Sequence, residues 1–133
     1  LLLRPGAVPV RGRTLLVVLA AAGLAGVASA QERTPVRDAR QLLVAAIDAS
    51  DGKAQGLLVG DVADAITRRF KATTPIYIDV STERRYAQPG CSRLLVRFWQ
   101  DGVLLPGAAS PRRQTIDFRL DYCRDGLPPK SRS

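Results

Sequence analysis

The side chains that most often carry out catalysis are scarce in this chain of 133 residues. It contains no His, and Glu32 and Glu83 are its only glutamates, so the commonest general base is missing and carboxylates are few. Ser50 near Lys53 is the closest pairing of a nucleophile with a base, but it falls in a predicted turn. Two widely spaced cysteines without His do not make a zinc site of the usual kind. We therefore expect a protein that is not an enzyme and that holds no metal or cofactor.

Residues 1–30 have the composition of an export signal. A basic leader precedes the uncharged run Leu15–Val27, and Ala28-Ser29-Ala30 supplies the small residues that signal peptidase requires. The run is shorter than the roughly 20 residues that cross a bilayer. An uncleaved membrane anchor is the alternative, but we predict cleavage after residue 30 and no stable membrane span afterwards. The mature chain would start at Gln31 and would be periplasmic or secreted.

The export signal also sets the expected state of Cys91 and Cys123. Both would reach an oxidising compartment, where we expect them to form a disulfide. Of the 20 Lys and Arg residues three lie in the leader, so the mature chain keeps 17 against 12 Asp and Glu, a net charge of +5. This excess would attract anionic partners. The doublets Arg68-Arg69, Arg84-Arg85 and Arg112-Arg113 lie near element ends, where charge also caps helices and protects strand edges.

Two amphipathic helices are predicted in the first half of the mature chain. The first begins at Thr34-Pro35, where a capping side chain precedes a proline, and ends at Asp51-Gly52. Its apolar stripe has helical spacing and consists of Ala39, Leu42, Leu43, Ala46 and Ile47. The second helix covers about Leu57–Lys71, with an apolar side and two arginines in its last turn.

After Thr74-Pro75 the apolar residues alternate, which predicts β-strands. One strand starts at Ile76, and two more cover about Ser92–Gln100 and Arg113–Cys123. A Pro/Gly-rich connection joins the last two.

The cysteines suggest a register for the last two strands. If Cys91 faces Cys123 in an antiparallel pair, the facing residues match in character on both faces. The apolar pairs are Leu94 with Leu120, Val96 with Phe118 and Phe98 with Ile116, and the charged pairs are Arg93 with Asp121 and Arg97 with Asp117. A shift of two residues in either direction would put an arginine opposite Arg119.

These elements predict a single α+β domain over residues 31–124. Two N-terminal amphipathic helices would pack on a three-stranded antiparallel meander tied by one disulfide. The helices would cover the face that carries Ile76, Ile78, Val80, Leu94, Val96, Phe98, Ile116, Phe118 and Leu120. Residues 125–133 have nothing to pack and are expected to be disordered.

The opposite face of the sheet carries the first candidate partner-binding residues, Trp99, Arg97 and Arg119. Arginines beside an aromatic ring can bind a nucleic-acid strand. An ordinary solvated face is the favoured interpretation, because a cross-strand aspartate would neutralise Arg97, and nucleic acid is not the expected partner. Trp99 is the best single candidate for a protein contact, since an exposed Trp is costly to leave uncovered.

The long connection between residues 100 and 112 holds the other candidates, Val103, Leu104 and Leu105. Connections of this length often serve binding. Alternatively, Asp101-Gly102 makes a tight turn and the three apolar residues close one end of the core. The sequence does not decide between these two interpretations.

Four segments within residues 36–129 carry a resemblance to known proteins. They are Arg68-Arg69-Phe70 through Thr74-Pro75-Ile76, Gln88-Pro89-Gly90-Cys91-Ser92-Arg93-Leu94, Gln100-Asp101-Gly102-Val103 and Asp121-Tyr122-Cys123. Together they resemble a family of small exported proteins associated with conjugative plasmids, integrative conjugative elements and type IV secretion gene clusters of proteobacteria. The resemblance implies a periplasmic accessory role, such as assembling or stabilising the transfer apparatus, and assigns no role to any residue.

The sequence thus predicts a non-enzymatic periplasmic protein that binds an envelope protein partner, in conjugative transfer or type IV secretion. The alternative is a secreted inhibitor or toxin-like factor that acts on an extracellular protein target. A disulfide-stabilised domain with an exposed loop would suit that role equally well.

Overall fold

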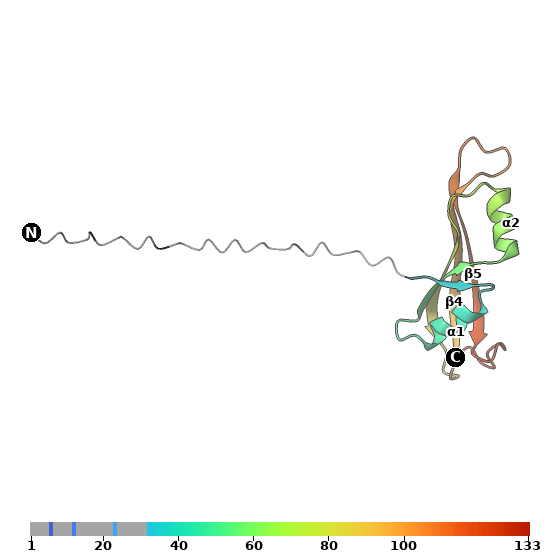
Figure 1. The fold of residues 1–133 in the computed structure, drawn as a ribbon. Helices are drawn as coiled ribbons and strands as arrows, with labels where there is room; N and C mark the ends of the chain where they lie inside the picture. Colours follow the sequence, from blue (N-terminus) through green and yellow to red (C-terminus); the bar gives the residue numbers. More distant parts are fainter. Residues whose placement is uncertain (1–5, 7–11, 13–22, 24–31) are drawn as a thin grey trace, which may run out of the picture.

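The computed structural model describes residues 32–133 and, before them, only Gly6, Gly12 and Gly23. Apart from these glycines, the predicted export signal lies outside the described residues. The described chain forms, in order, β1 (Thr34–Val36), α1 (Arg40–Asp48), β2 (Lys53–Leu58), α2 (Asp61–Arg69), β3 (Ile76–Arg85), β4 (Cys91–Val103) and β5 (Arg112–Cys123) (Figure 1). Neither helix of this part of the chain is long and apolar enough to cross a membrane.

The five strands form one mixed sheet in the order β1-β2-β3-β4-β5. β1 runs parallel to β2, and the other neighbours are antiparallel. The predicted α+β class is confirmed. The predicted three-stranded meander with both helices ahead of it is wrong, because α1 lies between β1 and β2 and α2 lies between β2 and β3.

The first two strands escaped the sequence analysis because their residues resemble the starts of helices. Thr34-Pro35, interpreted as a helix cap, belongs to β1, an edge strand where a residue without N–H is tolerated. In β2, a Cβ on Gly56 would lie 2.6 Å from Cδ1 of Leu42. Gly56 therefore lets α1 pack directly on the strand. The second helix begins only at Asp61, after Gly60 turns the chain with a φ of 112°.

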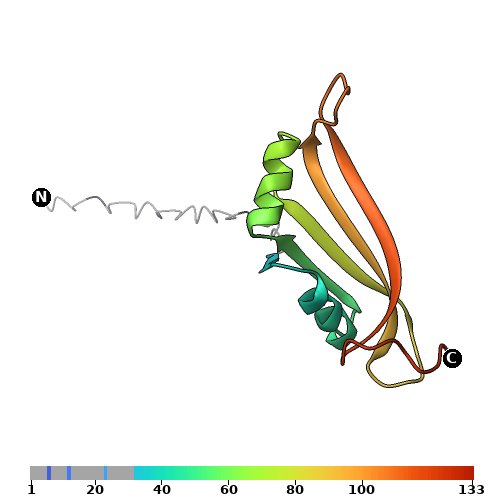
Figure 2. The ribbon, with the colours of Figure 1, turned by 90° about the vertical axis from the view of Figure 1, so that its right-hand side faces the viewer.

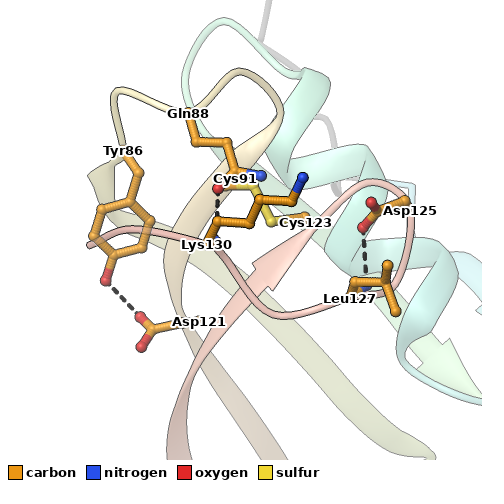
Figure 3. The surroundings of a disulfide bond; sticks show 8 residues. All are labelled: Tyr86, Gln88, Cys91, Asp121, Cys123, Asp125, Leu127 and Lys130. Carbon is orange, nitrogen blue, oxygen red and sulfur yellow. Dashed lines mark hydrogen bonds between the residues drawn. A yellow bond between two sulfur atoms is a disulfide. The ribbon is translucent and has the colours of Figure 1, made fainter. Parts of the chain in front are cut away.

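The predicted register of the last two strands is confirmed. Cys91 faces Cys123, and the two form a disulfide with their Cα atoms 4.0 Å apart (Figure 3). The other predicted partners also face each other: Arg93 and Asp121, Leu94 and Leu120, Val96 and Phe118, Arg97 and Asp117, and Phe98 and Ile116. β4 is longer than predicted and continues to Val103, with an irregularity after Gln100.

The core lies under α1, on the face of the sheet that we call the inner face; the opposite face is the outer face. Its buried residues are Val36, Leu42, Leu43, Ala46, Ile47, Ile78, Val80, Leu94 and Val96. The two helices lie at opposite ends of the strands, with α1 near the disulfide and α2 near the β4–β5 loop (Figures 1 and 2). Within α2, Ala63 is the one buried residue.

The expectation that the helices cover the whole inner face is wrong at β5. Ile116 is 67% exposed and Phe118 is 42% exposed, although both point to the inner side. Each helix has nine residues and is therefore about 13 Å long, too short to cover five strands from edge to edge. The apolar surface of β5 is left open as a result.

The C-terminal segment from Asp125, expected to be disordered, makes polar contacts with the turn between β3 and β4, with β5 and within itself. The backbone N–H of Lys130 donates to Oε1 of Gln88 at 2.7 Å, and Arg132 lies 3.2 Å from Asp121 (the former drawn in Figure 3). Asp125 accepts a hydrogen bond from the N–H of Leu127 at 2.9 Å. Polar bonds place this segment, which is why its lack of an apolar pattern gave no signal.

Candidate functional site

An apolar groove opens where α2 approaches the inner face of β4 and β5. Its volume is about 450 Å³, and we call it the α2 groove. Its lining residues are Leu58, Ile66, Phe70, Ile76, Phe98, Trp99, Gln100, Val103, Leu105, Gln114 and Ile116. None of them carries a charge. The groove exists because α2 stands over the end of the sheet while α1 covers the other end.

Backbone and amide bonds hold α2 beside the groove. Gln100 is buried, and its Nε2 donates to Oγ1 of Thr67 at 2.9 Å and to the carbonyl of Thr74 at 2.8 Å. The N–H of Leu104 donates to the carbonyl of Phe70 at 2.8 Å, which ties the β4–β5 loop to the end of the helix. The amide N–H groups of Gln100 are thus used inside the protein, and Gln114 is the other polar residue in a lining that is otherwise almost entirely apolar.

The structure combines the two interpretations of the loop candidates. Val103 is 4% exposed, as the tight-turn interpretation required, but it lines the α2 groove and is not part of the core under α1. Leu105 is 40% exposed at the mouth of the α2 groove, where it is available to a partner. Leu104 is half-buried between them. The chain turns at residues 104–111, beyond Asp101-Gly102, because β4 continues through Val103.

A second recess continues the groove beneath the loop. Its volume is about 310 Å³, and it shares Val103, Leu105 and Gln114 with the α2 groove. Arg112 lines this recess. Arg68, Arg69, Lys71 and Arg112 make no ion pair with any residue of the described chain. The first three lie at the C-terminal end of α2, beside Phe70, whereas Asp61 and Asp64 lie in its first turn and likewise form no ion pair within the described residues. Positive charge without an ion pair therefore flanks the loop end of the groove.

Trp99, the leading candidate on the outer face, has its ring surfaces occupied by its own chain. Its ring centroid lies 4.2 Å from that of Tyr77, and the Arg113 guanidinium lies 4.3 Å from the indole. The indole N–H donates to Asp79 at 2.7 Å. Arg33 adds to this cluster, because its guanidinium lies 4.7 Å from the centroid of the Tyr77 ring. Trp99 is therefore half-buried within a stacked cluster and offers little open ring surface for a base to stack on.

Arg97 and Arg119, the other outer-face candidates, are both ion-paired. Arg97 donates two hydrogen bonds to Asp117, at 2.8 and 2.7 Å, and these bonds hold the pKa of Asp117 below its ordinary value. Arg119 donates to Glu83 at 2.6 Å across the intervening strand. The predicted pair of Arg93 with Asp121 also forms, at 3.3 Å. These contacts agree with the interpretation favoured from sequence, in which the outer face is solvated and aspartate or glutamate neutralises its arginines.

Tyr86 and Asp121 form a further polar contact beside the disulfide. The hydroxyl donates to Oδ1 of Asp121 at 2.5 Å, which raises the pKa of Tyr86 above its ordinary value and lowers that of Asp121 (Figure 3).

Within residues 32–133 the structure contains no cluster of three or more Cys, Asp or Glu that could hold a metal ion.

Comparison with known proteins adds no relationship. No family model, curated protein or solved structure matches this chain. The family resemblance in the four sequence segments therefore remains a prediction.

The candidates named from sequence divide between two surfaces. Trp99, Arg97 and Arg119 belong to the outer face, whereas Val103 and Leu105 belong to the α2 groove, whose lining Trp99 also borders. Ile66, Phe70 and Ile116 were not predicted as binding candidates, because their sequence pattern is typical of core residues. One feature of the sequence could have indicated an open apolar surface. The inner face of the predicted sheet has nine apolar positions, which is more than two short helices can cover.

Proposed function

We propose that this chain is a non-enzymatic envelope domain that binds a protein partner by taking an apolar segment with acidic neighbours into the α2 groove. The observation that carries the proposal is an uncharged apolar groove flanked by cations that no acidic residue of the described chain neutralises. The proposal that the domain acts in conjugative transfer or type IV secretion rests on the family resemblance.

The lining favours apolar side chains over a small polar ligand. An occupant would find no charged group in the groove, and the Gln100 amide N–H groups are already bonded, so a polar ligand would lose most of its water bonds, with Gln114 as the other polar lining residue. Burial of apolar side chains is favourable by about 25 cal/mol for each Å² removed from water. Ile116 and Leu105 would gain most, because they are the lining side chains that remain exposed, at 67% and 40%.

The flanking charge selects among apolar segments. Arg68, Arg69, Lys71 and Arg112 would attract acidic residues on the partner and repel basic ones. The same cations disfavour occupancy by a basic, membrane-inserting helix. An acidic apolar segment of an extracytoplasmic protein fits both features, and the Cys91–Cys123 disulfide supports residence in an oxidising compartment.

Site-specific cross-linking in the native host tests the proposal. A photoreactive amino acid replaces Leu105 at the groove mouth, and in a matched control it replaces Leu127, an exposed leucine at the disulfide end that is 62% exposed. We expect an adduct with an envelope protein from position 105 and none from position 127. Mass spectrometry of the adduct should identify a conjugation or type IV secretion component.

A functional assay completes the test. Leu105→Asp should abolish the adduct formed by a photoreactive group at a neighbouring loop position and reduce DNA transfer, whereas Leu127→Asp should leave both unchanged. Equal cross-linking from positions 105 and 127 would contradict binding in the groove. Recovery of the protein from the culture medium, bound to a target there, would favour the secreted inhibitor instead.

A further inference from the structure

The edge of the sheet at β5 is a second surface that the protein itself leaves unpaired. β5 has 12 residues and pairs with β4 on one side only. At its end, the N–H of Cys123 donates to the carbonyl of Leu127 at 3.2 Å, so the C-terminal segment covers that position. Residues 115–119 are all exposed. A long exposed edge strand is a template for pairing with another strand.

The backbone bonds of Cys91 show which groups of β5 point to the open edge. The carbonyl of Cys91 accepts from the N–H of Tyr86 at 3.1 Å, on the side of β3. Cys91 and Cys123 are therefore a non-hydrogen-bonded pair, in agreement with their Cα separation of 4.0 Å. Since backbone groups alternate along a strand, the open edge presents the N–H and C=O groups of Thr115, Asp117, Arg119 and Asp121. None of these groups has a hydrogen-bond partner within residues 32–133.

The side chains beside this edge are apolar on one face and charged on the other. Ile116 and Phe118 are exposed on the inner face, with Leu120 half-buried next to them. Asp117 and Arg119 stand on the outer face with opposite charge, two positions apart. A strand of this pattern can be its own complement when it pairs with a reversed copy.

We propose that β5 pairs in antiparallel fashion with β5 of a second copy of this chain, about a twofold axis that passes through Phe118. Facing residue numbers then add to 236, which sets Phe118 against its own copy and Ile116 against Leu120. On the outer face Asp117 meets Arg119 twice, once on each side of the axis. Thr115, Asp117, Arg119 and Asp121 supply the edge hydrogen bonds, and the sheet continues through both copies.

Charge disfavours three of the neighbouring registers. A twofold axis at Asp117 would set that carboxylate against its own copy. An axis at Arg119 would set two guanidiniums together, and it would also bring Asp117 opposite Asp121. An axis at Ile116 would set Arg113 opposite Arg119. Like charges directly opposite each other destabilise a sheet, so these three registers are disfavoured. An axis at Leu120 has no like-charge pair, but it would set Asp117 opposite Cys123, whose N–H is already bonded to the carbonyl of Leu127. The axis at Phe118 is therefore the favoured register. It also overlaps almost the whole of β5.

The occupant of this edge is a second copy of the chain and not the groove partner, and the pairing does not rest on the proposed function, although Ile116 borders both surfaces. The two copies would present their α2 grooves on one continuous face. A partner with two binding segments would then engage both, which raises its apparent affinity through effective concentration.

Disulfide trapping tests the register directly. In the proposed dimer the Cα atoms of Phe118 and its copy lie about 4.5 Å apart, as in any non-hydrogen-bonded pair. Phe118→Cys should therefore form a covalent dimer under mild oxidation. Ile116→Cys is the matched control, because the two copies of position 116 are offset by four residues, roughly 14 Å, which no disulfide bridges. A dimer trapped by Ile116→Cys at least as readily as by Phe118→Cys would overturn the proposal.

Sedimentation of the mature protein tests the association without added cysteines. A concentration series from about 5 to 500 µM covers the weak associations expected of an interface below ~1,200 Å². Arg119→Glu should weaken association at least tenfold, because each Asp117 would then face a like charge. Arg124→Glu, which also removes an exposed ion pair, with Asp48 at 2.7 Å, should leave it unchanged. A wild-type protein that stays monomeric throughout, or equal weakening by both variants, would refute the pairing.

Discussion

Removal of the Cys91–Cys123 disulfide should lower the free energy of unfolding by about 4 kcal/mol. The bond closes a loop with a sequence separation of 32. With that separation as loop length, the entropy lost by the unfolded chain corresponds to about 3.7 kcal/mol at 25 °C. Both cysteines are buried beside Tyr86, so replacement by Ala also loses a small amount of packing.

Urea unfolding of Cys91→Ala/Cys123→Ala, compared with wild type, measures this difference. Trp99 is the only tryptophan and lies at the centre of the stacked cluster on β4, so its fluorescence reports the loss of the sheet. Wild type unfolded in the presence of a reductant is the control, since it removes the cross-link and keeps both side chains. Measurement at low protein concentration prevents association through β5 from adding to the stability.

The reduced wild type separates the contribution of the cross-link from that of the packing of the two cysteine side chains. We expect it to lose most of the stability that the double alanine variant loses, because the cross-link acts chiefly on the unfolded chain. A loss of less than about 1 kcal/mol for both proteins would refute the reasoning, since it would mean that the unfolded chain already holds β4 and β5 together.

Three further predictions concern packing, stacking and charge. Gly56→Ala should destabilise the fold by about 1–3 kcal/mol in urea unfolding, because the added methyl group collides with Leu42 of α1; an unchanged midpoint would contradict the close packing of α1 on β2. Trp99→Ala should cost about 1–3 kcal/mol through its aromatic and cation–π contacts, yet leave the circular dichroism spectrum native, whereas complete unfolding would place the ring in the core. The pKa of Asp117 is lowered by Arg97, so its stabilising contribution is present above the unfolded pKa of about 3.9 and is lost as pH falls through the lower folded pKa. Asp117→Asn should therefore flatten part of the fall in thermal stability below about pH 4, and an unchanged acid profile would count against this ion pair.

The sequence predicted best what depends on pairing between neighbouring strands. The register of β4 and β5 followed from three independent features that had to agree: two cysteines, alternating apolar residues and opposite charges. A single shift would have violated at least one of them. Because these features constrain the same register independently, the disulfide and five facing pairs were predicted correctly.

The predictions that were wrong concern β1 and β2, whose structure depends on contacts that a local sequence pattern does not encode. Thr34-Pro35 is equally suited to a helix start and to an edge strand, and only the parallel pairing with β2 decides between them. Gly56 lowers the strand propensity of β2, but it is required there because α1 packs against it.

The α2 groove was hidden for a related reason. Alternation along a strand identifies the apolar face of a sheet but not how much of that face a helix will cover. Ile116 and Phe118 have the pattern of core residues, and they are exposed because each helix is short. The area left open is set by helix length and position, which follow from Gly60 and from the loop at Phe70 rather than from β5 itself.

The backbone at the two ends of α2 has a consequence for how the domain opens. Gly60 and Lys71 both have positive φ, 112° and 50°, and the helix between them buries only Ala63. A segment with so few buried contacts should exchange its amide hydrogens through local opening. The amides of Leu94 and Val96, which lie in the buried core beneath α1, should exchange only when the whole domain unfolds. The domain would thus consist of a cooperative unit at the disulfide end and a separately melting unit at the groove end, and a bound partner would join the two into one.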